Sequence, residues 1–326
     1  MAPGSGRSKE ITTMTNPSGN ISLMAQPAQD AAAAPVIRTI GLSDLHDALR
    51  LGWEDFKAVP THAIVLCLIY PVLGLVLARI VVGYSVLPLL FPLAAGFALI
   101  GPFAALGLYE LSRRLERGEQ TPTWGALEVL RSPSFGAMLG LGTLLLALFV
   151  TWVATAQAIY VAAFGHEAAA GIPDFVAEVL TTPHGWWLIA AGCSVGFLFA
   201  VVALCVSVVS FPLMLDRHVD AGDAMVTSLR TVARNPVPMA AWGLIVAVLL
   251  ALGSLPFFLG LAVVIPLLGH ATWHLYRKVV APDPTRSAID PSMPAIRERR
   301  FAADFPSNLF PPWRRKQRIH FYDSSE

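Results

Sequence analysis

The chain has 326 residues, of which 55% are hydrophobic and only 14% are charged. Soluble domains carry about 25% charged residues, so this composition argues against a soluble enzyme and predicts a membrane protein. The formal net charge of +1 identifies no partner, and no stretch resembles the basic face of a nucleic-acid-binding module, so no nucleic-acid partner is expected.

The N-terminal segment, residues 1–35, is polar, rich in small residues and ends in AQDAAAAP. It contains no apolar core of the length that a secretory signal needs, and its composition is typical of a disordered segment. We therefore expect a disordered cytoplasmic tail here. A membrane domain over 36–280 and a basic, proline-rich cytoplasmic tail over 281–326 are expected to follow.

Apolar runs long enough to cross a bilayer, about 20 residues each, fill the membrane domain. One stretch, from Val237 to Tyr276, would reach about 60 Å as a helix, twice the thickness of the hydrocarbon core. The sequence GSLP at 253–256 supplies a turn near its middle, so we divide this stretch into two helices. The sequence thus predicts an all-α protein with six transmembrane helices, over 62–82, 86–109, 135–160, 186–213, 237–253 and 255–276.

The placement of basic residues predicts the orientation of these helices. Of the 23 Lys and Arg residues, all except Arg79 lie before the first helix, in the connections 110–134 and 214–236, or after residue 276. The connection 164–185 contains no Lys or Arg, and its charged residues are the acidic Glu167, Asp174 and Glu178. Because cytoplasmic loops carry an excess of Lys and Arg, we expect both termini in the cytoplasm and an even number of helices.

A repeated segment precedes the odd-numbered helices. The sequence DALRLGWEDFKAVP (47–60) aligns without gaps to DAMVTSLRTVARNP (223–236), and a shorter relative, TPTWGALEVLRSP, occupies 121–133. In the first copy an apolar stripe at helical spacing is suited to the membrane interface; it comprises Leu42, Leu45, Leu49, Trp53 and Phe56. We expect three helical hairpins, each preceded by a short interfacial helix. The alternative is that the segments are not repeats and that proline recurs in them by chance.

The segment GHATWHLYRKVV, residues 269–280, contains the best candidates for a metal site. His270 and His274 lie four residues apart, so a helix places both rings on one face, and such pairs can share a metal. His62 is a candidate third ligand. The competing and favoured interpretation is an anchor at the headgroup level, supported by the aromatic and basic neighbours Trp273, Tyr276, Arg277 and Lys278. We therefore expect no bound metal or other cofactor.

The remaining motifs indicate packing rather than chemistry. The spans contain almost no ionisable residues, which argues against a proton-coupled transporter, and the common catalytic motifs are missing, so no catalytic residue is assigned. GAMLG (136–140) and GCSVG (192–196) are patterns that allow close helix contact. In the C-terminal tail a basic cluster can bind anionic lipid or merely be solvated; it contains Arg314, Arg315, Lys316 and Arg318.

Three segments resemble a bacterial integral membrane family, domain of unknown function 2189: RTIGLSDLHDALRLGWEDF, GPFAALGLYELSRRLERGE and GHATWHLYRKVV. The resemblance extends over 36–280 and implies a multi-pass protein of the bacterial inner membrane. The family has no established activity, although some similar proteins are labelled as cytochrome c oxidase subunits.

The most consistent function is a non-enzymatic accessory or scaffolding role in the lipid bilayer, with a membrane-protein partner or a homo-oligomer. A metal- or haem-associated subunit of a respiratory oxidase is the alternative, and a small-solute transporter or channel is the third.

Overall fold

The computed structural model describes residues 35–59, 79, 92–93, 101–102, 105–121, 125–166, 171–255 and 258–282. The expected spans 62–82 and most of 86–109 lie outside the described residues, as do His62 and the C-terminal basic cluster. The chain divides into two units at Pro35, and the arrangement below concerns the second unit.

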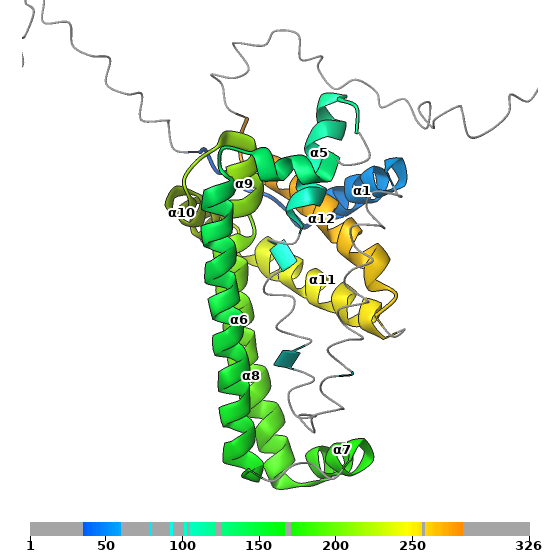
Figure 1. The fold of residues 1–326 in the computed structure, drawn as a ribbon, viewed down its shortest axis with the longest axis vertical. Helices are drawn as coiled ribbons and strands as arrows, with labels where there is room; N and C mark the ends of the chain where they lie inside the picture. The colour runs from blue at the N-terminus through cyan, green and yellow to red at the C-terminus, as the bar shows by residue number, and fades with distance from the viewer. Residues whose placement is uncertain are drawn as a thin grey trace, which may run out of the picture. The chain divides into compact units, whose positions relative to one another are not determined.

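The described residues form an all-α fold, as predicted. Apart from an isolated bridge between Ile37 and Val280, their regular structure is helical. The helices, labelled in Figure 1, are α1 (Leu42–Ala58), α5 (Leu106–Arg117), the 3₁₀ helix η2 (Gly125–Arg131), α6 (Phe135–Phe164), α7 (Ile172–Thr181), α8 (Pro183–Ser207), α9 (Ser210–Arg217), α10 (Ala221–Arg234), α11 (Pro236–Ser254) and α12 (Leu261–Val279).

Three segments are long and apolar enough to cross a membrane: α6, the α8–α9 segment Pro183–Arg217, and α11. They coincide with the expected spans 135–160, 186–213 and 237–253. Large apolar side chains on them point outward; Leu146, Phe197 and Leu244 are 50%, 67% and 65% exposed. A helix that is apolar on all sides and exposes such residues is suited to a lipid environment.

The contact between α6 and α8 uses one of the two small-residue patterns. A Cβ atom on Gly196 would lie 2.8 Å from the indole of Trp152, whereas one on Gly136, Gly140 or Gly192 would meet nothing within 4 Å. The second glycine of GCSVG therefore lies against α6, whereas the two glycines of GAMLG face away from the described neighbours. The predicted close contact is confirmed for Gly196 only.

The expected sixth span differs from the observed helix. We predicted 255–276, but α12 begins at Leu261 and ends at Val279, and it is not among the three span-like segments found in the described residues. Its first half is apolar, while its second half contains two histidines, Arg277 and Lys278 and is mostly buried. This second half packs among polar helices rather than continuing as an apolar span.

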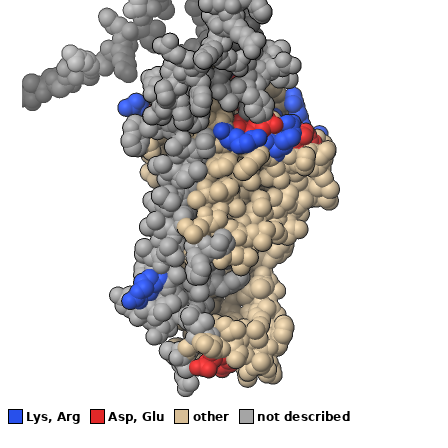
Figure 2. All heavy atoms as spheres, turned by 90° about the vertical axis from the view of Figure 1, so that its right-hand side faces the viewer, with Lys and Arg blue, Asp and Glu red and all other residues tan. Residues whose placement is uncertain are grey.

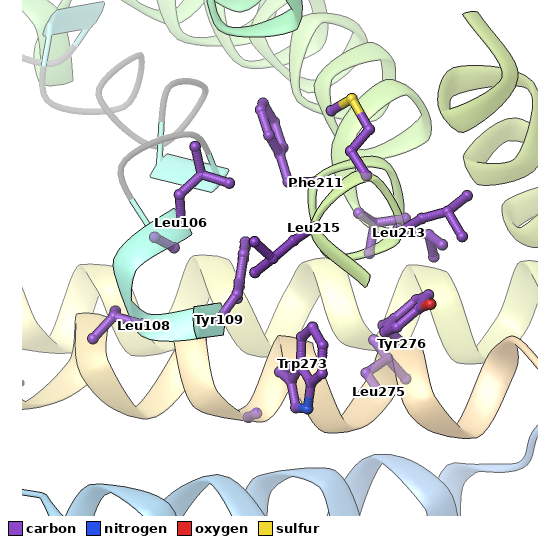
Figure 3. Close-up of a cluster of buried hydrophobic side chains, with 14 of the residues drawn as sticks. Leu106, Leu108, Tyr109, Phe211, Leu213, Leu215, Trp273, Leu275 and Tyr276 are labelled. Carbon is purple, nitrogen blue, oxygen red and sulfur yellow. The ribbon is translucent and has the colours of Figure 1, made fainter. Parts of the chain in front are cut away.

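These polar helices gather at one end of the span-like helices. We call the assembly of α1, α5, α9, α10 and the second half of α12 the cap (Figure 1). Figure 3 shows the apolar centre of the cap, where Tyr109 of α5, Leu215 of α9 and Trp273 of α12 converge. Each of these three side chains is at most 2% exposed.

Charge is distributed unevenly between the two ends. On the face drawn in Figure 2, Lys, Arg, Asp and Glu form a band at the cap, and a broad surface of uncharged residues lies below it, with one basic group at its left edge. Acidic side chains reappear at the opposite end, where α7 carries Asp174 and Glu178 (Figure 1). An apolar band between two charged ends is the pattern expected of a protein that crosses a bilayer.

The two long repeat segments form helices at matching positions, α1 and α10, and Ala48 and Ala224 are both fully buried. The stripe predicted on α1 is divided between two environments, since Leu42 and Trp53 are 58% and 42% exposed. The face that includes Leu45, Ala48 and Phe56 packs against α12, which runs antiparallel beside it (Figure 3). The shorter relative forms only the 3₁₀ helix η2.

Candidate functional site

His270 and His274 lie on one face of α12, as their spacing predicts, but inside the protein. His270 is 0% exposed and His274 is 6% exposed. Gly269 lets α5 approach this face closely, because a Cβ atom there would lie 2.5 Å from the Leu108 side chain. The two imidazoles therefore face α1 and α5 instead of a lipid headgroup region.

Close approach of α1 brings a carboxylate to these histidines. A Cβ atom on Gly52 would lie 2.6 Å from the backbone nitrogen of Ala271, so the two helices touch along their backbones at this point. Asp55 follows one turn after Gly52 and is therefore on the same face of α1. It is 0% exposed.

Four side chains from three helices form a hydrogen-bonded group that we call the buried polar cluster: Asp55, Ser112, His270 and His274. Ser112 Oγ donates to Asp55 Oδ2 over 2.8 Å, and His274 Nε2 lies 2.7 Å from the same oxygen. Ser112 Oγ also lies 2.8 Å from His270 Nδ1. The cluster thus cross-links α1, α5 and α12.

The protons in this cluster can be assigned by counting donors. The hydroxyl of Ser112 has one hydrogen, which it donates to the carboxylate of Asp55. In the neutral ring, His270 Nδ1 then carries the hydrogen and donates it to Ser112 Oγ, which leaves Nε2 of His270 as an acceptor. That Nε2 atom is buried and has no hydrogen-bond partner among the described residues.

The geometry does not match nucleophilic catalysis. In a Ser-His-Asp triad the histidine takes the serine proton and the carboxylate orients that histidine. Here Ser112 donates to the carboxylate itself, and Asp55 contacts the other histidine. With both Ser112 and Asp55 fully buried, the arrangement stabilises helix packing.

A metal centre is not formed by the residues that the structure describes, since none of their His, Cys, Asp and Glu side chains gather in groups of three or more that could hold an ion. The expected third ligand, His62, lies outside the described ranges. His270 Nε2 is the one atom of the buried polar cluster that retains an open ligand position within those ranges.

The aromatic and imidazole side chains of the 269–280 segment lie inside the protein. Trp273 and Tyr276 are each 1% exposed. The indole of Trp273 donates to Glu116, and the hydroxyl of Tyr276 donates to Asp216 over 2.7 Å. Membrane anchors place their rings at the lipid surface, whereas these rings are covered by α5 and α9 (Figure 3).

A group of ion pairs lies on α5 and joins it to η2. Glu110, which is 1% exposed, accepts hydrogen bonds from both Arg113 and Arg114, and Arg114 also pairs with Glu128 of η2. Partners with delocalised charge and fixed geometry are those best able to offset the burial of a carboxylate.

Further pairs join the ends of α1 and α12. Lys278 Nζ lies 3.0 Å from Asp44 and 3.1 Å from Asp47. A hydrogen bond from the backbone of Gly41, together with Lys278, lowers the pKa of Asp44. Partial burial opposes the charge of Lys278, but the hydrogen bonds to Asp44 and Asp47 dominate and raise the pKa of Lys278. These pairs hold the first turn of α1 to the last turn of α12.

The comparisons with known proteins give one positive result. Residues 89–216 match the family described as Predicted integral membrane protein (DUF2189). Of the three segments that carried the resemblance, GPFAALGLYELSRRLERGE lies inside this range and the other two lie outside it. No curated protein and no solved structure matches the chain. Over residues 89–216 the chain is thus similar to this integral membrane family.

Proposed function

We propose that the protein is a six-span component of the bacterial inner membrane with a non-enzymatic accessory or scaffolding role. In this proposal the cap lies on the cytoplasmic side, both termini are cytoplasmic, and α7 lies on the periplasmic side. The basic residues of the cap and the acidic residues Asp174 and Glu178 of α7 support this orientation through the positive-inside rule.

The observation that carries the accessory role is the internal pairing of the buried polar cluster. Asp55, Ser112 and His274 are the side chains best suited to chemistry in the described residues, and they hydrogen-bond to one another inside the protein. Groups used in this way stabilise packing and specify how helices fit together. A rigid cap on lipid-facing helices is a structure suited to holding a second membrane protein.

The span-like helices supply the second support. The sequences of α6, α8 and α11 contain no Asp, Glu, Lys or Arg. Thr143, Thr151 and Thr155 of α6 donate to carbonyl groups of their own helix. Transport pathways depend on ionisable groups within spans, so these three helices favour the accessory role over a proton-coupled transporter.

Recovery of the chain from membranes tests the accessory role. The full-length protein, expressed at low level with a small affinity tag, should be extracted in a mild detergent and weighed by native mass spectrometry. An accessory protein should appear in an assembly of fixed stoichiometry, either with itself or with another membrane protein, above the 35.0 kDa of the single chain. Recovery only as a monomer would contradict the role.

The alternative, a metal- or haem-associated oxidase subunit, is favoured by the open Nε2 position of His270, since imidazole nitrogens are the common ligands of both groups. The same preparation decides it through its optical spectrum and its content of iron, copper and zinc. We expect no Soret band and no stoichiometric metal. Stoichiometric metal that disappears in His270→Gln, but not in the exposed control His184→Gln, would establish the alternative.

A further inference from the structure

Helix α10 has an inverted distribution of polarity. Its buried face consists of small and polar side chains: Ala224, Thr227, Ser228 and Thr231. Its outward face exposes Val226 at 44% and Leu229 at 56%. A helix on a water-soluble protein turns its apolar side chains inward, so the exposed Val226 and Leu229 favour an apolar medium along this side of α10.

The repeat partner α1 buries larger apolar side chains than α10 does. Leu45 and Phe56 pack against α12, whereas Leu42 and Trp53 are 58% and 42% exposed. Both aligned helices therefore present apolar side chains that no described part of the chain covers, and on α10 these are Val226 and Leu229. An interfacial position in the membrane accounts for these side chains.

The position of α10 in the chain agrees with this environment. It ends at Arg234, and the span-like helix α11 begins two residues later at Pro236, with Asn235 between them. Figure 1 looks nearly along the axis of α10 while α6 and α8 run vertically, so α10 crosses these helices. Its last turn is therefore at the level where a span enters the bilayer.

At the end of α10, Asn235 joins two segments that both carry basic residues. Its side-chain oxygen accepts a hydrogen bond from the backbone of Ile40 over 2.9 Å, and its side-chain nitrogen donates to the carbonyl oxygen of Arg38 over 3.2 Å. Asn235 is 1% exposed. This clamp holds the 36–40 segment beside the end of α10, although the two segments are 195 residues apart in sequence.

The two segments joined by this clamp carry three exposed arginines: Arg38, Arg230 and Arg234. Arg230 and Arg234 are four residues apart and share a face of α10, and Arg234 reaches Thr39 Oγ1 at 3.5 Å. Within the described ranges none of the three forms an ion pair with a carboxylate. The acidic residues of this region, Asp220 and Asp223, lie at the first turn of α10, away from the clamp.

We propose that Arg38, Arg230 and Arg234 bind the phosphate headgroups of anionic glycerophospholipids in the leaflet in which α10 lies. Guanidinium groups pair with phosphate oxygens through two parallel hydrogen bonds. The outward Val226 and Leu229 would contact the acyl chains of the same leaflet. This proposal requires that α11 enters the bilayer after Pro236, and it is independent of the accessory role.

The first test measures lipid binding to the full-length protein in detergent by native mass spectrometry. The probes are phosphatidylglycerol and phosphatidylcholine with identical acyl chains. Wild-type protein should bind phosphatidylglycerol more tightly, and R38Q/R230Q/R234Q should lose that preference by about tenfold or more, since each basic residue strengthens binding to an anionic leaflet about fivefold.

The control variant R50Q/K57Q/R131Q removes the same number of exposed basic side chains elsewhere in the protein and should retain the preference within about twofold. Equal binding of the two lipids by wild type, or equal losses in the two triple variants, would overturn the proposal. Displacement of bound phosphatidylglycerol by millimolar inorganic phosphate would also overturn it, because the site would then be one for a soluble anion.

A second measurement does not depend on the arginine variants. A fluorophore attached to Leu229→Cys, in a chain whose Cys67, Cys193 and Cys205 are replaced by alanine, reports the medium outside α10 in phosphatidylglycerol vesicles. Quenching by lipids with spin-labelled acyl chains is the expected result. Quenching by aqueous iodide instead would show that this face meets water or a soluble partner, and the lipid site would be excluded.

Discussion

At the scale of single residues, the buried carboxylate of Asp55 is the most demanding feature of the cap. Removing a carboxylate from water costs several kcal/mol unless good hydrogen bonds replace its hydration. Ser112 and His274 both supply hydrogens to the same oxygen of Asp55. The three helices are therefore held in one arrangement, because moving any of them would remove a hydrogen bond from the buried carboxylate.

The first prediction concerns the stability that is lost when Asp55 is removed from the buried polar cluster. Asp55→Ala leaves Ser112 Oγ and His274 Nε2 without their acceptor, and it should lower the free energy of unfolding by about 3–5 kcal/mol. The matched control is Glu54→Ala on the same helix, where the pair with the half-exposed Arg50 should contribute less than about 1 kcal/mol. Unfolding in a graded detergent mixture measures both, and equal effects of the two changes would contradict the structural role of Asp55.

The pairing of Asp44 with Lys278 gives a prediction about pH. Because the pKa of Asp44 is lowered in the folded protein from its ordinary value of 3.8, its stabilising effect is present above that value. The effect is lost as the pH falls through the lower folded pKa. The thermal midpoint of Asp44→Asn should therefore lie below that of wild type at pH 7, and the two should converge as the pH falls below about 4. A difference that persists unchanged at pH 3 would contradict the assignment.

The sequence predicted part of the candidate site. The spacing of His270 and His274 placed both rings on one face, and the structure confirms this. Asp55 was not predicted as a site residue because its neighbours in sequence are charged. The predicted stripe was also centred on Leu49 and Trp53 instead of Gly52. One signal was present: Asp55 follows Leu45, Ala48 and Gly52 at helical spacing. Ser112 could not be placed, since it meets Asp55 across 57 residues of sequence.

At the scale of helices, the contact between α1 and α12 depends on the absence of one side chain. A Cβ atom on Gly52 would lie 2.6 Å from Ala271 nitrogen and 2.8 Å from Ala271 Cα. These are backbone atoms, so they cannot move aside as a flexible side chain would. Only a shift of a whole helix could make room for a methyl group.

Gly52→Ala should therefore destabilise the cap, although alanine normally favours a helix over glycine by about 1 kcal/mol. We expect a net loss of about 1–3 kcal/mol, as for overpacked cores. Gly140→Ala in α6 is the matched control, because a Cβ atom there meets nothing within 4 Å, and it should be neutral or stabilising. The free energies of unfolding of both variants check this, and a stabilising effect at Gly52 would show that α1 and α12 are not in contact.

Helix boundaries show where sequence patterns succeed and where they do not. The apolar runs predicted α6 and α11 to within a few residues, because an all-apolar helix needs no tertiary partner to be recognised. The segment 186–213 divides into α8 and α9, and the break at Val208–Val209 precedes Pro212, which cannot donate to the preceding turn. The partner of the α1 stripe could not be predicted, since lipid and another helix both accept an apolar face.

At the scale of the whole membrane domain, the two ends differ in the charged residues that they carry. The cap carries basic residues with acidic partners, whereas α7 carries only acidic ones. The described helices between them expose apolar side chains. Such an apolar surface marks contact with lipid or with another protein, and the match to an integral membrane family favours lipid.

The most direct test of this account is the accessibility of two engineered cysteines in a chain lacking Cys67, Cys193 and Cys205. Asp174→Cys lies in α7 and Glu119→Cys follows α5, and both positions are exposed. In cells with a permeabilised outer membrane, an impermeant maleimide should modify Asp174→Cys at once and Glu119→Cys only after the inner membrane is disrupted. Modification of both cysteines from the same side would contradict a membrane-spanning arrangement of α6 and α8.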